Sequence, residues 1–147
     1  MRPVVAGDFT GALAKGRRRM EDFMVDTCVI TKAGPGTGAF NETTGQYDTP
    51  ARVVVYTGRC RIQDASLVGG QGKMEERGVG DHEATYLTMK LQLPVEGGSA
   101  MVRPDQRVEI TRSCGDPELE GRMFFVESTH HKTHATHRRF RIREVIG

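Results

Sequence analysis

The sequence predicts a mainly β protein: a small antiparallel β-barrel or sandwich of about six strands, with a short N-terminal helix and long glycine-rich loops. Apolar and polar residues alternate with the period of two that is typical of half-buried strands. Strands and helical segments do not alternate along the chain, which argues against a doubly wound parallel sheet. Glycine contributes 18 of the 147 residues. That is about 12% against a usual ~7%, as expected for a chain with many turns.

The length and charge of the chain narrow its class. We expect 147 residues to form a single domain, residues 1–147. Lys and Arg number 21 and Asp and Glu 19, so the net charge is +2. This balance excludes a strongly basic nucleic-acid binder and an acidic disordered tail. Hydrophobic residues make up 37%, below the usual ~45–50%, so we expect a modest core and some apolar surface completed by neighbours.

The sequence gives no sign of a membrane span, a secretory signal or disulfide bonds. No apolar run approaches the ~18–20 residues that a membrane span needs. The N-terminal MRPVVAGDFTG contains no secretory signal. The three cysteines, Cys28, Cys60 and Cys114, are odd in number and form no C-x-x-C pair. We therefore predict three free thiols in a reducing compartment.

The N-terminal helix is predicted over residues 8–22. Leu13, Arg17 and Met20 recur there at i, i+4 and i+7, the spacing of one helix face. The period then changes, and residues 23–32 are rich in Val, Ile and Thr, which predicts the first strand.

Five further strands are predicted, over residues 52–63, 86–95, 107–113, 122–129 and 138–146. The segment 86–95 has the clearest pattern, in which apolar residues at every second position should face the core: Leu87, Met89, Leu91, Leu93 and Val95. Thr88 belongs to the opposite face, which we expect to meet solvent. Gly58, in the middle of the strand 52–63, predicts a bulge or a bend.

Two glycine-rich segments are predicted as loops. Residues 33–50 contain four glycines and two prolines and should form a loop or loose turn. Residues 65–83 contain five glycines with mixed charges and should form a long flexible loop, the place where function most often resides in such a chain. Six of its side chains are candidates for contacts with neighbouring subunits: Leu67, Lys73, Met74, Glu75, Glu76 and Arg77.

No catalytic or nucleotide-binding motif is present. The segment GGQGKM lacks the Ser or Thr that follows the lysine of a phosphate-binding loop, and no apolar helix follows it. We therefore expect no enzyme activity and no cofactor. Histidines gather in HHKTHATH, at His130, His131, His134 and His137. Imidazole is a common metal ligand, but the adjacent Lys and Arg would repel a cation, so we expect a surface cluster and keep metal binding as an alternative.

Arginines gather at two places. Arg17, Arg18 and Arg19 lie on adjacent angles of the predicted helix. Three others share one face of the last strand, with Glu144 the only acid nearby in sequence: Arg139, Arg141 and Arg143. Both groups can be solvated surfaces, or contacts with an acidic subunit or with DNA. Few aromatic residues interleave with them, so base stacking by an OB-type barrel is not indicated.

Several segments together resemble a known family. These are GRRRMEDFMVDTCVITK, a turn containing ETTGQYD, VVYTGRCRIQ, LQLP, VRPDQRVEITRSCGDPELEGRMFFVEST and the closing RRFRIREV. The D-x-x-L-x-G turn consists of Asp116, Leu119 and Gly121. Their order resembles that of head–tail connector or stopper proteins, the small tail-completion proteins of tailed bacteriophages, in particular phages that infect actinobacteria. The resemblance extends from about Gly16 to Val145.

The resemblance implies a structural virion protein without catalytic residues. Such proteins form a homo-oligomeric ring at the head–tail neck, between the portal-bound adaptor and the tail, and DNA passes through the ring. The resemblance thus implies three kinds of partner: further copies of the chain, adaptor or portal proteins, and tail terminator or tail-tube proteins. It also implies non-specific contact with DNA and assembly in the host cytoplasm. A β-rich composition favours a stopper over an adaptor, and a tail terminator is the nearest alternative. The histidine cluster receives no role from the resemblance.

Overall fold

The computed structural model of the protein describes residues 6–64, 73–79 and 82–145. The chain begins with helix α1 (Ala6–Asp22), and a short helix α2 (Gly97–Ala100) and a 3-10 turn η1 (Pro117–Leu119) come later. The strands are β1 (Asp26–Lys32), β2 (Phe40–Asn41), β3 (Gln46–Tyr47), β4 (Val53–Asp64), β5 (Lys73–Val79), β6 (His82–Leu93), β7 (Arg107–Arg112), β8 (Met123–His130) and β9 (Arg138–Val145). Neither helix is long and apolar enough to cross a membrane within the described ranges.

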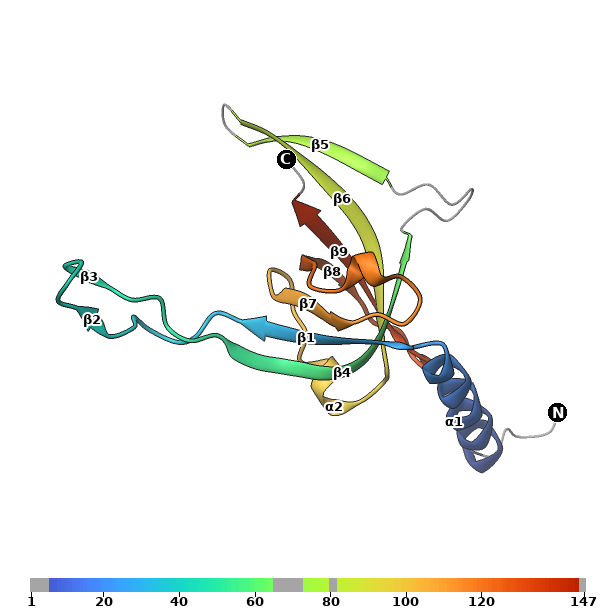
Figure 1. Cartoon of the computed structure of the whole chain (residues 1–147). Helices are drawn as coiled ribbons and strands as arrows, with labels where there is room; N and C mark the ends of the chain where they lie inside the picture. The colour runs from blue at the N-terminus through green and yellow to red at the C-terminus, as the bar shows by residue number, and fades with distance from the viewer. Residues whose placement is uncertain (1–5, 65–72, 80–81, 146–147) are drawn as a thin grey trace.

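Six strands close into an antiparallel barrel. The large sheet has the order β4-β1-β7-β8-β9-β6-β5, and a further pairing between β4 and β6 joins its ends (Figure 1). The predicted fold class, a mainly β protein with a short N-terminal helix, is therefore confirmed, and the barrel alternative is the correct one. β5 is the seventh strand of the sheet and lies outside the barrel, paired only with β6.

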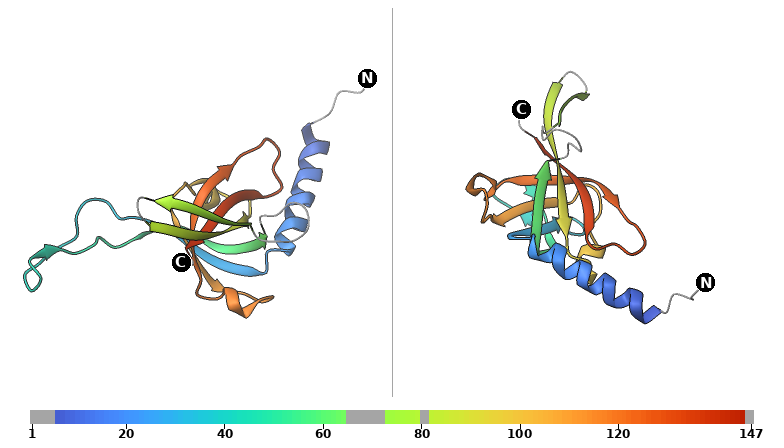
Figure 2. Two further views of the ribbon diagram at one scale, coloured as in Figure 1. Left: turned by 90° about the horizontal axis from the view of Figure 1, so that it is seen from above. Right: turned by 90° about the vertical axis from the view of Figure 1, so that its right-hand side faces the viewer.

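The edge of β6 that meets β4 also carries β5. Residues 89–92 of β6 pair with residues 61–64 of β4, while residues 82–88 pair with residues 73–79 of β5. The opposite edge of β6 pairs with β9 over residues 86–93. Because β6 is longer than the barrel needs, its first half and β5 form a hairpin that extends beyond the barrel (Figures 1 and 2).

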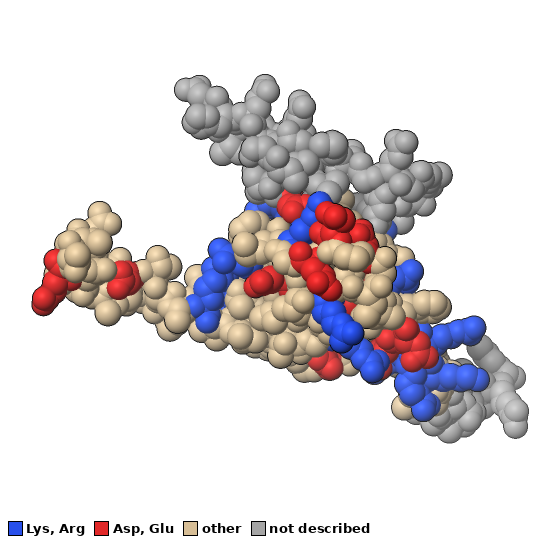
Figure 3. Space-filling model, viewed as in Figure 1, with Lys and Arg blue, Asp and Glu red and all other residues tan. Residues whose placement is uncertain are grey.

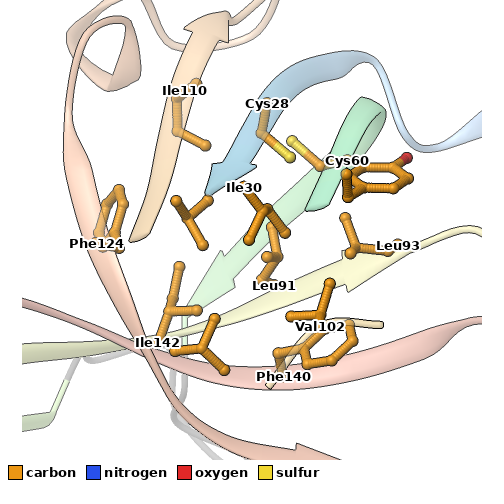
Figure 4. Packing of buried hydrophobic residues seen from close by; sticks show 13 residues of the cluster. Cys28, Ile30, Cys60, Leu91, Leu93, Val102, Ile110, Phe124, Phe140 and Ile142 are labelled. Atoms are coloured by element: carbon orange, nitrogen blue, oxygen red, sulfur yellow. The ribbon is translucent and has the colours of Figure 1, made fainter. Parts of the chain in front are cut away.

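The barrel interior is filled by apolar side chains. The alternating residues of the strands converge there, among them Ile30, Leu91, Phe124 and Phe140 (Figure 4). Cys28 and Cys60 are also fully buried, and Cys114 is exposed; all three are free thiols. The hydrogen bond with Cys60, together with burial, raises the pKa of the Cys28 thiol.

Gly58 and the bulge of β4 are separate features. The register of β1 against β4 shifts between Ile30 and Thr31, which leaves Val55 as the extra residue. Of the two predicted alternatives at Gly58, a bulge or a bend, the bulge lies three positions earlier. Gly58 instead has φ +154, and a Cβ there would lie 2.9 Å from the Tyr56 hydroxyl oxygen. That hydroxyl donates a 2.6 Å hydrogen bond to the Arg59 carbonyl, so glycine lets the Tyr56 ring lie across its own strand.

One face prediction for β6 is wrong. Leu91 and Leu93 are fully buried, as the alternation predicts, but Thr88 and Gln92 on the opposite face are only 1% and 4% exposed. Gln92 Nε2 donates to Gln63 Oε1 at 2.8 Å, across the pairing that closes the barrel. The outer face of the closing strands is therefore covered and polar, an arrangement that alternation within a single strand does not distinguish from a solvated face.

The second predicted loop is shorter than expected. Residues 73–79 form β5 and residues 82–83 begin β6, so the prediction of a loop over the whole of residues 65–83 is wrong there. Residues 65–72 and 80–81 lie outside the described residues. Charged residues and Gly78 hide the strand in the sequence, because β5 forms by pairing with β6 rather than through an alternating pattern of its own.

The first predicted loop is a two-stranded arm. β2 and β3 pair antiparallel, and the segment that carries them, residues 33–52, projects from the barrel (Figures 1 and 2). Added Cβ atoms at Gly34 and Gly38 would lie 2.2 and 2.1 Å from carbonyl oxygens of the opposite side, those of Ala51 and Asp48. These glycines therefore serve the close approach of two backbones, and not a loose loop.

Alanine substitutions on the inner and outer faces of the barrel wall should differ in their effect on the free energy of unfolding. Leu91→Ala should lower the free energy of unfolding by ~2–5 kcal/mol, because Leu91 is fully buried between closing strands. Thr57→Ala, at an exposed position of β4, should change it by less than about 0.5 kcal/mol. Urea denaturation measures both values, and equal small effects would contradict the core assignment.

Candidate assembly surfaces

Helix α1 rests on the histidine-containing turn between β8 and β9. Arg17 Nε donates to the Ala135 carbonyl at 3.1 Å, and the Phe9 and His134 rings meet edge to face at 4.3 Å. A Cβ on Gly16 would lie 3.2 Å from the Thr136 methyl carbon, so the helix packs closely there. The turn thus positions the helix, which is a structural role for the histidine segment.

The four histidines do not converge on one point. His130, His131 and His134 are exposed, while His137 is 5% exposed. His137 Nδ1 lies 3.0 Å from the Thr136 hydroxyl oxygen, and its Nε2 accepts a 2.8 Å hydrogen bond from Arg139 Nε. Within residues 6–64, 73–79 and 82–145, no three His, Cys, Asp or Glu side chains could hold a metal ion together.

The buried histidine is kept neutral by its surroundings. Burial lowers the pKa of His137, and the positive charges of Arg139, Lys132 and Arg61 lower it further. A neutral ring can accept the hydrogen bond from Arg139, whereas an imidazolium would have to break it. The site therefore links the end of the turn to β9 only while His137 is unprotonated.

The arginine face of β9 is paired within the barrel. Arg141 Nε lies 3.0 Å from Glu127 Oε2, and an Arg143 guanidinium nitrogen lies 3.4 Å from Asp105 Oδ1. Arg139 donates to His137. Glu144 is the only acid near these arginines in sequence, but Glu127 and Asp105 come close to them in the folded barrel.

Helix α1 keeps a basic exposed surface. Arg18 and Arg19 are exposed, and Lys15 is exposed one turn earlier, while Arg17 is half-buried against the turn. At the end of the helix, the Phe23 ring lies under the Arg61 guanidinium at 5.3 Å, yet Phe23 remains 54% exposed. Blue side chains gather over α1 in the space-filling view (Figure 3). This end of the molecule combines positive charge with exposed apolar surface.

The arm exposes two aromatic rings. Phe40 and Tyr47, paired across β2 and β3, meet edge to face at 5.2 Å and are 53% and 64% exposed. The turn between them is ordered by Asn41, whose Oδ1 accepts from the Thr43 and Thr44 backbone N–H groups. Gly45 closes the turn with φ +68. The ring pair is therefore presented on a defined hairpin at a distance from the barrel.

Arg52 fixes the base of the arm. Its Nε donates to Thr31 Oγ1 at 2.8 Å, and its guanidinium NH2 donates to the Thr31 carbonyl at 3.1 Å. Val53 and Val54, the next residues, are 40% and 57% exposed. Large exposed apolar residues thus continue from the arm onto the start of β4, an arrangement that sequence reasoning missed. Two sequence signals for this surface were available: the glycines of the arm, Gly34 and Gly38, and the spacing of Phe40 and Tyr47.

The structure describes five of the six predicted interface residues. Five of them lie on β5, in the hairpin that extends from the barrel: Lys73, Met74, Glu75, Glu76 and Arg77. Leu67 lies outside the described residues. Their role as contacts with neighbouring subunits stays a prediction.

Comparison with known protein families identifies a match over most of the chain. Residues 16–143 match DUF6093, described as a family of unknown function. The chain belongs to the DUF6093 family. No curated protein and no solved structure matches it. The match begins at Gly16, where α1 packs on the turn, and covers the arm and all six barrel strands up to Arg143 of β9.

The stability of this DUF6093 protein should fall in mild acid through His137. The unfolded chain takes up a proton near the ordinary histidine pKa of about 6.5, before the folded chain does, so lowering the pH favours unfolding. His137→Gln should lose less stability between about pH 7.5 and 5.5 than the wild type. Urea denaturation at several pH values tests this, with exposed His130→Gln as the control. Equal pH slopes for wild type and His137→Gln would contradict it.

Loss of the arm clamp should loosen the arm without unfolding the barrel. Arg52→Ala removes both hydrogen bonds to Thr31, so amide exchange in residues 38–48 should rise about thirtyfold, since each of the two hydrogen bonds contributes ~1 kcal/mol. The amides to follow include those of Gly38 and Asp48, which bond across the arm. Arg112→Ala, at the exposed end of β7, is the matched control. Unchanged exchange in Arg52→Ala would show that the clamp does not hold the arm.

Proposed function

We propose that this chain is a structural protein of the phage head–tail neck, a stopper or connector that forms a ring around the DNA channel between adaptor and tail. The motif order of the sequence suggests this role, and the architecture supports it. The barrel is small and its interior is filled by its own side chains (Figure 4). Surfaces that contact other molecules must therefore lie on the outside of the barrel or on its projections.

The observation that carries the proposal is where the exposed apolar residues lie. Most of the large ones sit on α1, on its junction with β1, on the arm or at the base of the arm: Phe9, Phe23, Val25, Phe40, Tyr47, Val53 and Val54. Met101 and Met123 complete the set among the described residues. Apolar side chains gathered on projections mark surfaces that other proteins cover. A catalytic or ligand-binding site, by contrast, needs polar side chains that converge in a pocket.

The proposal assigns partners to these projections. Copies of the chain contact one another in the ring, and the adaptor or portal and the tail terminator or tail tube contact its two ends. The isolated chain is a monomer or weak oligomer, because its projections find their partners only in the neck. DNA in the channel meets the ring through non-specific contacts with basic side chains.

A tail terminator is the second candidate within the same class. Both roles need a small β-rich ring subunit, and the barrel with its projections suits either. A metal-binding protein is less favoured, because His137 is committed to Arg139 and His134 packs on Phe9.

Deletion of the gene from a phage that encodes this chain should distinguish a stopper from a tail terminator. Loss of a stopper should leave tails of normal length and heads that package DNA but neither retain it nor join tails. Loss of a terminator should leave DNA-filled heads and tails of abnormal length. Electron microscopy of the lysates and a reconstruction of complemented particles measure these outcomes. Complementation with Thr57→Ala, a substitution at an exposed position of the barrel, is the positive control.

Two results would contradict the neck assignment. One is infectious, DNA-retaining particles formed without the chain. The other is a reconstruction that places the chain as a single copy or an isolated two-fold dimer, since a ring requires a heterologous interface that repeats.

A further inference from the structure

We infer that the arm of one copy docks on the exposed face of helix α1 of the next copy; this inference rests on the ring of the proposed function. The docking surface on the arm is its tip, residues 40–48. The docking surface on the helix consists of the exposed side chains of Lys15, Arg18 and Arg19, with Phe23 and Val25 at the helix end. The occupant of each surface is therefore a second copy of this chain.

The two surfaces have opposite charge. Residues 33–51 contain Glu42 and Asp48 and no Lys or Arg. The run from Lys15 to Arg19 contains four basic residues and no acid, and Glu21 and Asp22 follow it before Phe23, so the part of the helix that complements the arm is this basic run. In the space-filling view, red side chains lie on the arm and blue ones over α1 (Figure 3). Complementary potentials of this kind select one partner orientation and reject like-charged approaches.

The two surfaces also have complementary contact chemistry. Phe40 and Tyr47 offer exposed aromatic faces held by an ordered turn, which lowers the entropy cost of binding. Aromatic residues and arginine are the side chains most enriched at the centres of protein interfaces. Arginines over a Phe or Tyr face gain cation–π attraction, as Arg61 over Phe23 already does within the chain.

The placement of the two surfaces makes the contact intermolecular. The arm and α1 project from opposite sides of the barrel in the views of Figures 1 and 2. An arm fixed at its base by Arg52 cannot reach the helix of its own copy. A contact between different surfaces on opposite sides repeats head to tail, and it gives a ring where the rotation closes.

Photo-crosslinking between two populations of the full chain tests the contact. Tagged copies carry benzoylphenylalanine in place of Tyr47, and untagged copies are isotopically heavy. At protein concentrations up to about 1 mM, which capture weak association, cross-links should join residue 47 to heavy peptides from residues 15–25. Glu42→Lys with Asp48→Lys in the tagged copies should lower the yield at least about fivefold. Arg18→Glu with Arg19→Glu in the heavy copies should restore at least about half of the original yield.

A matched control separates this contact from a general charge effect. Glu109→Lys with Glu118→Lys makes the same change in net charge at exposed positions of the barrel and of η1, and it should leave the yield unchanged. The inference fails if cross-links form only within one copy, fall outside residues 15–25, are absent at about 1 mM, or ignore the charge reversals. Binding to duplex DNA that Arg18→Glu with Arg19→Glu abolishes, with no effect of these changes on cross-linking, would assign the helix to DNA instead. If the cross-linking fails but rings of the chain are present in phage necks, only the arm contact is overturned. If the chain is absent from the neck, the proposed function is overturned.

Discussion

The pairing of β4 with β6 turns a sheet with open edges into a closed barrel. Only four residue pairs make this closure, from Arg61 with Gln92 to Asp64 with Met89. Closure lets β4 supply Cys60 and β6 supply Leu91 to one interior, and it satisfies backbone groups that an edge would leave exposed. The outer side of the closure is also sealed, by the Gln92–Gln63 hydrogen bond and the burial of Thr88. The enclosed core depends on this short pairing.

Because the barrel is complete in itself, its projections are not needed to hold it together. The arm attaches to the barrel through Arg52 and Thr31 and carries no residue of the core cluster. A two-stranded hairpin is marginally stable alone, so the arm depends on its base contacts with the barrel, and the proposed contact with a second copy would add to them. Helix α1 is similar, because the turn before β9 holds one side of it and leaves Arg18 and Arg19 exposed. The core that stabilises the chain therefore lies in the barrel, and the proposed contacts lie on the projections.

The sequence predicts the barrel well because its wall strands alternate apolar core positions with polar ones, as β7 does around Val108 and Ile110. It fails where partners from elsewhere in the chain decide the structure. β5 forms because β6 is long enough to pair with it, and Thr88 is buried although its own strand pattern predicts exposure. Gly38 predicts a loop by composition, yet its role is to admit the Asp48 carbonyl. For the same reason Glu127 and Asp105, the partners of the β9 arginines, could not be found from local sequence.

The charge distribution explains how a nearly neutral chain can make directional contacts. On the barrel, Arg141 lies beside the half-buried Glu127 and Arg143 beside the exposed Asp105, and these acids offset the charge of the two arginines. Away from these pairs, the arm carries Glu42 and Asp48 without Lys or Arg, and α1 carries the basic run from Lys15 to Arg19, followed by Glu21 and Asp22. The Debye length is ~8 Å at physiological salt, so these ends do not attract one another across a barrel width. In the proposed ring, a net charge of +2 would let copies approach without strong repulsion, and opposite charges at contact range would favour head-to-tail over head-to-head alignment.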